Sequence, residues 1–247
     1  MTLEQFFQEN PRCALGFSGG VDSAYLLYAG VKARADIRPY FIKTAFQPAF
    51  ELADARKLAA GLGAEVTVLE LDALADPRMA ANPADRCYFC KQNLFRTLKE
   101  RAVADGYPVL LDGTNASDEA GDRPGMRALA ELSVRSPLRE CGLTKAEIRA
   151  RSREAGLFTW DKPAYACLAT RVPAGEAITA ETLARVEGGD HALFRLGNTD
   201  LRVRVSHGAT RLQLPRGQME RAVREAEELR QALKPYFTPI LLDLEGR

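Results

Sequence analysis

The chain has 247 residues, of which 46% are hydrophobic and 27% charged, and its formal net charge is +1. This composition is typical of a globular protein with one large core, or with a main core and a small second unit. The near-zero charge excludes a general attraction to nucleic acid or membrane surfaces, and no apolar run approaches the roughly 20 residues of a membrane span.

The start of the chain and its cysteines both indicate a cytoplasmic protein. Residues 1–7 contain no cationic segment and no long apolar stretch, so we expect no signal peptide. Five cysteines, an odd number without a secretory signal, argue against a disulfide framework. The thiols are therefore expected to be available for chemistry or for metal binding.

Strand-like and helix-like segments alternate through the first two thirds of the chain. Short apolar stretches predict strands at 13–17, 37–43, 65–70 and 109–112. Helices are predicted directly after residues 18–23, over 48–61 and 87–105, and from the capping box of Thr144 and Glu147 to about Gly156. This alternation is typical of an α/β protein, a parallel sheet of Rossmann-like type with helices on both faces.

The pattern changes after about Trp160. Residues 161–175 are rich in Pro and Ala without clear periodicity, which is typical of a functional loop. The segments that follow predict a helix, a two-stranded hairpin, a second helix and a last strand, at 179–196, 201–205 with 209–214, 218–233 and 239–244. We therefore expect an α/β domain over 1–161 and a small α+β domain over 162–247.

The turn after the first predicted strand reads Ser18-Gly19-Gly20-Val21-Asp22-Ser23. Its glycines let backbone N–H groups approach a ligand closely, and the helix that begins here adds a positive dipole end. The turn lacks the Lys of a Walker loop and matches instead the pyrophosphate loop (PP-loop) of adenylating ATP pyrophosphatases. The alternative is an ordinary strand-to-helix turn without a ligand.

A second polar turn, Asp112-Gly113-Thr114-Asn115, ends the fourth predicted strand. Since the carboxyl ends of parallel strands share one edge of a sheet, we expect this turn to face the same crevice as the first. Asp112 and Thr114 are candidates to contact a nucleotide or Mg²⁺, with a plain Asp-Gly turn as the alternative. Arg123, directly before Pro124, and Arg135, two residues before Pro137, are candidate phosphate clamps or surface charges.

Arg202 and Arg204 lie two residues apart in a predicted strand, so both side chains point to one face. Two guanidinium groups on one face suit a dianion such as a phosphate monoester. The alternative is a solvated strand face.

The cysteines fall into different settings. Cys13 lies in a buried strand and is expected to pack there, and Cys141 has no evident partner. Cys87 and Cys90 form a Cys-x-x-Cys whose cationic neighbours favour the thiolate, and Cys167 lies in a loop of small residues. The last three thiols suffice for a [4Fe–4S] cluster with one iron open to an external ligand. The alternative is a set of ordinary, unreactive thiols.

Taken in order, these motifs resemble the LarE-type ATP-dependent sacrificial sulfur transferases of the PP-loop superfamily, over about residues 15–246. The segments that carry the resemblance are 18–23, 86–91, 112–115, 123–125, 136–138, 142–145, 166–171, 202–204 and 207–208.

The resemblance implies a reaction in two stages. ATP adenylates a carboxylate of pyridinium-3,5-biscarboxylic acid mononucleotide and releases pyrophosphate, and sulfur then replaces AMP. The product is a thiocarboxylate on the way to the nickel-pincer nucleotide cofactor of lactate racemase. In the sacrificial version the cysteine that aligns with Cys167 gives up its own sulfur and becomes dehydroalanine.

The resemblance also implies residue roles and an assembly. The residues expected at the ATP site are Ser18, Gly19, Gly20, Val21, Asp22, Ser23, Lys43, Arg86, Lys91, Gly113, Thr114 and Arg123, with Asp22 as a candidate Mg²⁺ ligand. Cys167 is expected to be catalytic, and Arg171, Arg202 and Arg204 to bind the substrate. The family's hexamers imply a homo-oligomer, with no nucleic-acid or membrane partner.

Three departures from the family pattern matter. Cys87 and Cys90 are absent from the strictly sacrificial members, whereas a cluster-bearing branch uses three cysteines. A [4Fe–4S] cluster with an extra sulfide, held by these two and Cys167, is therefore one expected sulfur source, and sacrifice of Cys167 is the other. Gln213 stands where the family has an acidic residue, which puts a metal site there in doubt, and the chain ends at Arg247, earlier than expected.

Two other classes share the loop motif. A tRNA thiolase or an ammonia-dependent amide synthetase would also adenylate its substrate. The short, near-neutral chain shows no basic RNA module, and an amide synthetase has no need for Cys167. A nucleotide-binding module without catalysis is the third alternative.

Overall fold

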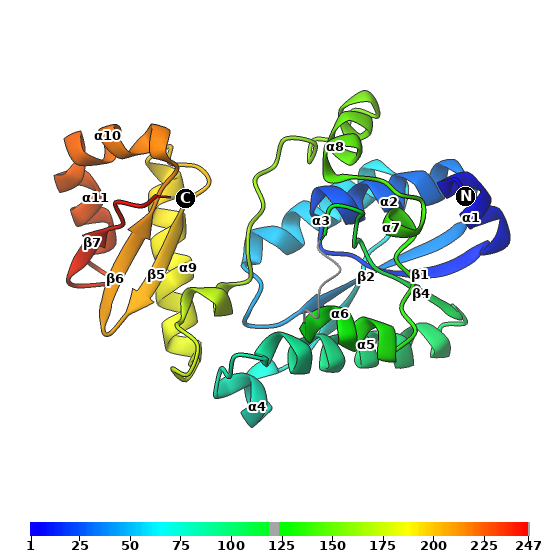
Figure 1. Cartoon of the computed structure of the whole chain (residues 1–247), viewed down its shortest axis with the longest axis horizontal. Coiled ribbons are helices and arrows are strands. Elements are labelled where there is room, and N and C mark those ends of the chain that lie inside the picture. Colours follow the sequence, from blue (N-terminus) through cyan, green and yellow to red (C-terminus); the bar gives the residue numbers. More distant parts are fainter. Residues whose placement is uncertain (119–123, 247) are drawn as a thin grey trace. The chain divides into compact units, whose positions relative to one another are not determined.

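The computed structural model describes residues 1–118 and 124–246, which group into two compact units (Figure 1). The first unit contains residues 1–44, 49–71, 85–118 and 124–162. The second contains residues 45–48, 72–84 and 163–246. Among the described helices, none combines the length and the apolar character that crossing a bilayer requires.

The first unit is built on a four-stranded sheet in which every strand pair is parallel, in the order β3-β2-β1-β4. The strands are β1 (Arg12–Gly16), β2 (Asp36–Lys43), β3 (Thr67–Glu70) and β4 (Val109–Leu111). Its helices are α1 (Leu3–Glu9), α2 (Val21–Lys32), α3 (Ala49–Gly61), α5 (Arg86–Ala104), α6 (Pro124–Glu131), α7 (Pro137–Glu140) and α8 (Lys145–Glu154). The α/β class predicted from the alternating segments is confirmed.

Helices cover both faces of this sheet, α2 on one side and α5 on the other (Figure 1). Successive residues of a strand point to opposite faces. Accordingly, Cys13 and Leu15 of β1 pack into the core beneath α2, whereas Ala14 between them packs beneath α5. Because both faces are buried, β1 is a continuous apolar run, and the expectation that Cys13 is a packing residue is confirmed.

Capping boxes fix two of these helices. At α8 the Thr144 side chain accepts from the Glu147 N–H while Glu147 accepts from the Thr144 N–H, as the sequence predicted. Thr2 and Gln5 form the same motif at α1, a short helix that the sequence analysis did not identify.

The second unit has a three-stranded mixed sheet in the order β5-β6-β7, with β5 and β6 antiparallel and β6 and β7 parallel. The strands are β5 (Arg202–Ser206), β6 (Ala209–Gln213) and β7 (Ile240–Leu242). The helices are η1 (Ala73–Ala75), α4 (Pro77–Ala80), η2 (Leu168–Arg171), α9 (Ala180–Arg195), α10 (Arg216–Arg224) and α11 (Ala226–Leu233). The predicted hairpin is confirmed.

The single helix predicted over 218–233 is wrong, because α10 and α11 meet at Glu225, which leaves helical geometry at φ −96°, ψ 18°. The Glu225 carboxylate accepts from Arg221 Nε, and Arg221 Nη2 donates to the carbonyl of Leu196. Side-chain contacts therefore stabilise the interruption between α10 and α11. The amphipathic pattern of the sequence continues across Glu225, so it gave no sign that the helix is interrupted there.

Two short segments join the second unit although they lie within the first 85 residues of the chain. The Leu168 N–H donates to the carbonyl of Phe46. The side-chain amide of Asn82, which is buried, donates to the carbonyls of Pro173 and Glu176. Because these hydrogen bonds join segments far apart in the sequence, a domain boundary predicted from local sequence patterns could not assign the two segments to the second unit.

Candidate functional site

The glycine-rich turn connects β1 to α2 and requires glycine at its second position. Gly19 has φ +71°, and a Cβ there would lie 3.1 Å from the backbone of Ala55. Gly20 is the N-cap of α2, and no side chain among the described residues caps this helix. The first N–H groups of α2 therefore face outward at the positive end of the helix dipole, an arrangement suited to an anion.

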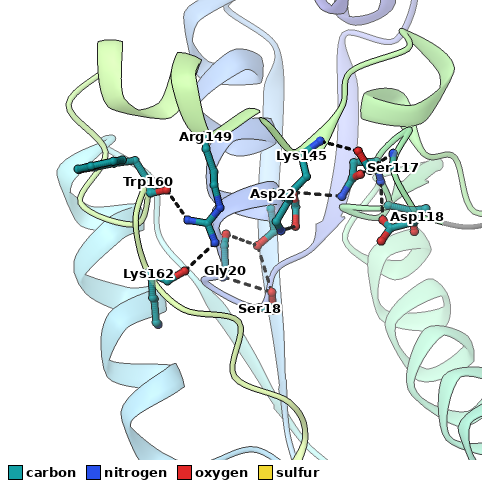
Figure 2. Close-up of polar contacts among 12 residues, drawn as sticks. Ser18, Gly20, Asp22, Ser117, Asp118, Lys145, Arg149, Trp160 and Lys162 are labelled. Atoms are coloured by element: carbon teal, nitrogen blue, oxygen red, sulfur yellow. Dashed lines mark hydrogen bonds and ion pairs between the residues drawn. The ribbon is translucent and has the colours of Figure 1, made fainter. Parts of the chain in front are cut away.

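Two serines brace the turn from within (Figure 2). Ser18 Oγ accepts from the Gly20 N–H and lies 3.2 Å from Ser23 Oγ, which also hydrogen-bonds to the Gly20 carbonyl. Ser18 is exposed and Ser23 is buried. The outer hydroxyl therefore remains accessible while the inner one fixes the loop.

The turn after β4 lies directly against the glycine-rich turn, as predicted from the shared sheet edge. A Cβ at Gly113 would lie 3.1 Å from the backbone nitrogen of Ser23, so glycine permits this close approach. Asp112 accepts from Ser136 Oγ at 2.6 Å, and its other oxygen accepts from Thr114 Oγ1. Asp112 thus organises the turn internally, and both of its oxygens are engaged within the protein.

Asp22 sits in the first turn of α2 and has two partners. Lys145 Nζ lies 2.5 Å from one carboxylate oxygen, and Asn115 Nδ2 donates to the other at 3.3 Å (Figure 2). Lys145 opens α8, so this ion pair joins residues 123 positions apart.

A group of charged residues lies at the end of β2 and the start of α3. Lys43 is the last residue of β2, and Lys162 Nζ pairs with Asp54 at 2.5 Å. Burial raises the pKa of Glu51 to about 7, although the nearby cations Lys162 and Lys43 act in the opposite direction. Glu51 thus keeps a proton at pH values where an exposed carboxyl has lost it.

We expect a Glu51→Gln variant to be more stable than the wild type by about 1–3 kcal/mol at pH 8, and to lose that advantage at pH 4. The unfolded chain releases the Glu51 proton near pH 4.5 and the folded chain near pH 7, so wild-type stability falls as pH rises through this window. Urea denaturation of both proteins at several pH values measures the difference. A constant difference across the pH range would contradict it.

The Cys-x-x-Cys lies in the first turns of α5. Cys87 is exposed and Cys90 is half-buried, and their i, i+3 spacing places both on one side of the helix. The guanidinium of Arg86, a buried side chain, lies 3.7 Å from the Cys87 sulfur. The Lys91 stem packs on Gly125, where a Cβ would lie 3.0 Å from Lys91 Cδ. Arg123, expected at the same site, lies outside the described residues.

In the second unit, Cys167 is the N-cap residue of η2, and its carbonyl accepts from the N–H and the hydroxyl of Thr170. Arg204 Nη1 donates to the Thr170 carbonyl at 2.8 Å, and Arg202 Nη2 donates to the Ala164 carbonyl at 3.4 Å. The arginines of β5 therefore hold the loop that carries Cys167.

Arg171 is completely buried and forms an ion pair of 3.3 Å with Asp190, which is also completely buried. Asp190 in addition accepts from the Tyr165 hydroxyl and from the Val203 N–H of β5. Burial raises the pKa of Asp190, while Arg171 and the two hydrogen bonds act in the opposite direction. This carboxylate connects η2, α9 and β5 at one point.

The same region contains buried guanidinium nitrogens that have no hydrogen-bond partner among the described residues, namely Nε and Nη1 of Arg171, whose guanidinium lies over the Tyr165 ring, and Nη1 of Arg202. Burial, together with Arg171 and Arg204, lowers the pKa of Arg202 to about 10. The positive charge of these arginines thus exceeds the negative charge of Asp190. Burying N–H donors that have no hydrogen-bond acceptor is also unfavourable. The arrangement suits an anionic ligand.

Gln213 connects Arg204 to a carboxylate that follows another strand. Arg204 Nε donates to Gln213 Oε1 at 2.5 Å, and Gln213 Nε2 donates to Asp243 at 2.6 Å. Asp243 also forms an ion pair with Arg211. The carboxylate of Asp243, one residue after β7, is therefore the acidic group of this network.

The thiols are divided between the two units, with Cys87 and Cys90 in the first and Cys167 in the second. Within either unit, the described residues contain no cluster of three His, Cys, Asp or Glu side chains suited to a metal ion.

Comparison with known proteins identifies the family. No family model matches the chain. A pyridinium-3,5-bisthiocarboxylic acid mononucleotide synthase of Lactiplantibacillus plantarum is 30% identical over 248 residues, which cover 99% of this chain and 90% of the relative. The chain belongs to the LarE-type family. Uncharacterised proteins of Synechocystis and Methanocaldococcus jannaschii are 39% and 27% identical to this LarE-type chain, over 92% and 91% of their own lengths.

Several residues of this LarE-type chain that support the two sites were not identified from the sequence. Sequence reasoning assigned Lys145 no role at a site, although it lies in a segment, 142–145, that carries the family resemblance. Asp190 and Tyr165 belong to no motif that the sequence analysis singled out. Asp243 follows the last strand and has the position of an ordinary turn residue. The available signal was that Asp190 interrupts the apolar residues Leu183, Val186 and Leu193, which recur at helical spacing and form the buried side of α9.

Proposed function

We propose that this protein is an ATP-dependent sulfurtransferase. Its substrate is pyridinium-3,5-biscarboxylic acid mononucleotide, and its product is the thiocarboxylate on the way to the nickel-pincer nucleotide cofactor of lactate racemase. The observation that carries this proposal is the second unit's site, where the loop of Cys167 is hydrogen-bonded to Arg202 and Arg204 beside unmet, buried guanidinium nitrogens. A sulfur atom and a site for a phosphate monoester thus belong to one small unit.

The glycine-rich turn of the first unit binds the phosphates of ATP in this proposal. The outward N–H groups at the start of α2, the exposed Ser18 hydroxyl and the dipole of α2 all favour an anion. Asp22 provides a carboxylate for the Mg²⁺ that accompanies the nucleotide. The substrate carboxylate attacks the α-phosphorus of ATP, the α–β bond breaks, and pyrophosphate leaves.

In the second unit, Arg171, Arg202 and Arg204 bind the substrate's phosphate. A phosphate dianion would supply acceptors for the three nitrogens without hydrogen-bond partners, and its charge would offset the burial and the mutual repulsion that together lower the pKa of Arg202. The substrate's reacting carboxyl would then lie close to the loop of Cys167, because the same two arginines of β5 hold that loop.

The sulfur source that we propose is a [4Fe–4S] cluster held by Cys87, Cys90 and Cys167. Three thiolates suit such a cluster and leave one iron open. Cys87 is exposed and Cys90 half-buried at the start of α5, and the Arg86 guanidinium lies 3.7 Å from the Cys87 sulfur. When bound, the cluster would supply an exchangeable sulfide to the acyl adenylate, so that AMP leaves and the chain stays intact. The mononucleotide itself is the partner, and a homo-oligomer, a hexamer in the family, is the assembly that we propose.

Anaerobic purification followed by iron analysis and intact-mass measurement tests this proposal. We expect about four iron ions per chain, lost in Cys87→Ala but retained in Cys141→Ala, a matched control outside the three ligands. The mass should be unchanged after turnover. A colourless protein that loses roughly 34 Da on turnover would instead show that Cys167 gives up its own sulfur as dehydroalanine forms. Absence of substrate-dependent ATP–pyrophosphate exchange would reject the adenylating function itself.

A further inference from the structure

The loop over residues 167–178, which we name the sulfur loop, is held at both ends by segments from much earlier in the chain. At its start the Leu168 N–H donates to the Phe46 carbonyl at 2.9 Å. At its end the Ile178 N–H donates to the Ala80 carbonyl at 2.8 Å. All of these residues belong to the second unit, so the loop is supported from within one compact body.

Asn82 makes further contacts with the end of the sulfur loop, although it lies 91 positions before Pro173. Its side-chain amide donates to the carbonyls of Pro173 at 2.7 Å, Glu176 at 3.1 Å and Val172 at 3.4 Å. Its own backbone carbonyl accepts from the Gly175 N–H at 2.8 Å. One asparagine thus binds the loop through both its side chain and its backbone.

The conformation and the burial of Asn82 both indicate that its position is specified. Its φ is +54°, in the left-handed region that asparagine adopts more readily than most residues. Only 1% of its surface is exposed. Burying an amide whose N–H donors have no acceptor is unfavourable, so these hydrogen bonds favour a single arrangement of Asn82 and the loop carbonyls.

The groups that the proposed function uses lie between the two supported ends. Cys167 is the N-cap residue of η2, and Arg171 is the last residue of η2. The Val172 carbonyl, to which Asn82 donates, belongs to the residue directly after Arg171. A displacement at Val172 would therefore move the backbone of Arg171 and, through the four residues of η2, that of Cys167.

We propose that Asn82 is a positioning residue for sulfur transfer, because it holds the sulfur loop in the arrangement from which Cys167 presents sulfur to the acyl adenylate. In that step sulfur forms a bond to the acyl carbon, the bond from this carbon to the AMP oxygen breaks, and AMP leaves with the electron pair. The substrate phosphate is bound from a different element, by Arg202 and Arg204 of β5. This inference rests on the proposed sulfurtransferase function.

Loss of the Asn82 amide should therefore slow sulfur transfer more than it weakens substrate binding. Asn82→Gly removes the amide and keeps a residue that adopts positive φ. We expect thiocarboxylate formation at saturating substrate to slow by about tenfold to a hundredfold, since misplacement of reacting groups by about 1 Å has effects of this size. The KM for the mononucleotide and the rate of ATP–pyrophosphate exchange should change by less than about threefold.

Asn198→Gly is the matched control. Asn198 is also buried in the second unit, and its amide donates to the Leu193 carbonyl in the last turn of α9 rather than to the sulfur loop. The control should transfer sulfur at a rate within about threefold of the wild type. An equal loss in Asn198→Gly would show that general destabilisation causes the effect, and would overturn the inference.

Hydrogen–deuterium exchange measures the loop itself. We expect peptides from residues 172–178 to exchange about tenfold faster in Asn82→Gly than in the wild type, while peptides from β5 stay unchanged. Asn82→Asp, whose ionised side chain has no N–H donor, replaces the glycine variant if circular dichroism shows that the latter is unfolded.

The inference and the proposed function fail in different ways. A folded Asn82 variant that transfers sulfur at the wild-type rate would overturn the role of Asn82. A wild-type chain that exchanges ATP with pyrophosphate yet forms no thiocarboxylate would instead overturn the proposed sulfurtransferase function.

Discussion

A Cys167→Ser variant is expected to adenylate its substrate at a rate within a few-fold of the wild type and to form no detectable thiocarboxylate. Adenylation is assigned to the glycine-rich turn of the first unit, whereas Cys167 belongs to the second. The local structure should survive the change, because the carbonyl of Cys167, rather than its sulfur, accepts the two hydrogen bonds from Thr170. Serine retains that carbonyl.

The expected loss of thiocarboxylate formation is at least about a thousandfold, since removing a group that carries the chemistry usually costs this much or more. ATP–pyrophosphate exchange and mass spectrometry of the product, measured on one preparation, separate the two half-reactions. Cys141→Ser is the matched control, because Cys141 only ends the short helix α7 and should retain both activities. Thiocarboxylate formed by Cys167→Ser would exclude a role for this residue in either sulfur route. Loss of both half-reactions would instead contradict their separation.

The parallel sheet was predictable because its signals are local. β1 is buried on both faces, so it is an uninterrupted apolar run, and the turn that follows has glycine where φ is positive. The capping box at α8 likewise lies within four residues. Sequence reasoning therefore located the strands, most of the helices and the edge of the sheet at which the two polar turns meet.

The partners of the site residues were not predictable, because they depend on contacts between distant segments. Lys145 and Asp22 are 123 positions apart, and nothing in either local pattern indicates the other. Asp190 lies in the middle of a helix, where a carboxylate is usually solvated, yet here it is completely buried. The break at Glu225 is held by side-chain contacts that leave the helical periodicity intact.

The largest stability effect is expected at Asp190. An Asp190→Ala variant should lose about 3–5 kcal/mol of unfolding free energy, because it leaves the Arg171 guanidinium buried without its counter-charge. The Tyr165 hydroxyl and the Val203 N–H lose their acceptor as well. Urea denaturation followed by circular dichroism measures the loss, and a change below about 1 kcal/mol would contradict it.

Arg202→Met is the informative companion to this change. Arg202 is repelled by Arg171 and Arg204, and one of its buried nitrogens has no hydrogen-bond partner among the described residues. Relief of these costs should offset the lost hydrogen bond to the Ala164 carbonyl, so the substitution should change stability by less than about 1 kcal/mol. Affinity for the mononucleotide substrate should nevertheless fall by tenfold or more, as expected for a lost charge-assisted contact to phosphate. The pair of Asp190 and Arg171 would then stabilise the folded unit. Arg202 would serve ligand binding, because its repulsion by Arg171 and Arg204 is relieved only when an anionic ligand binds. An Arg202→Met variant that is destabilised yet binds the substrate normally would reverse this assignment of roles.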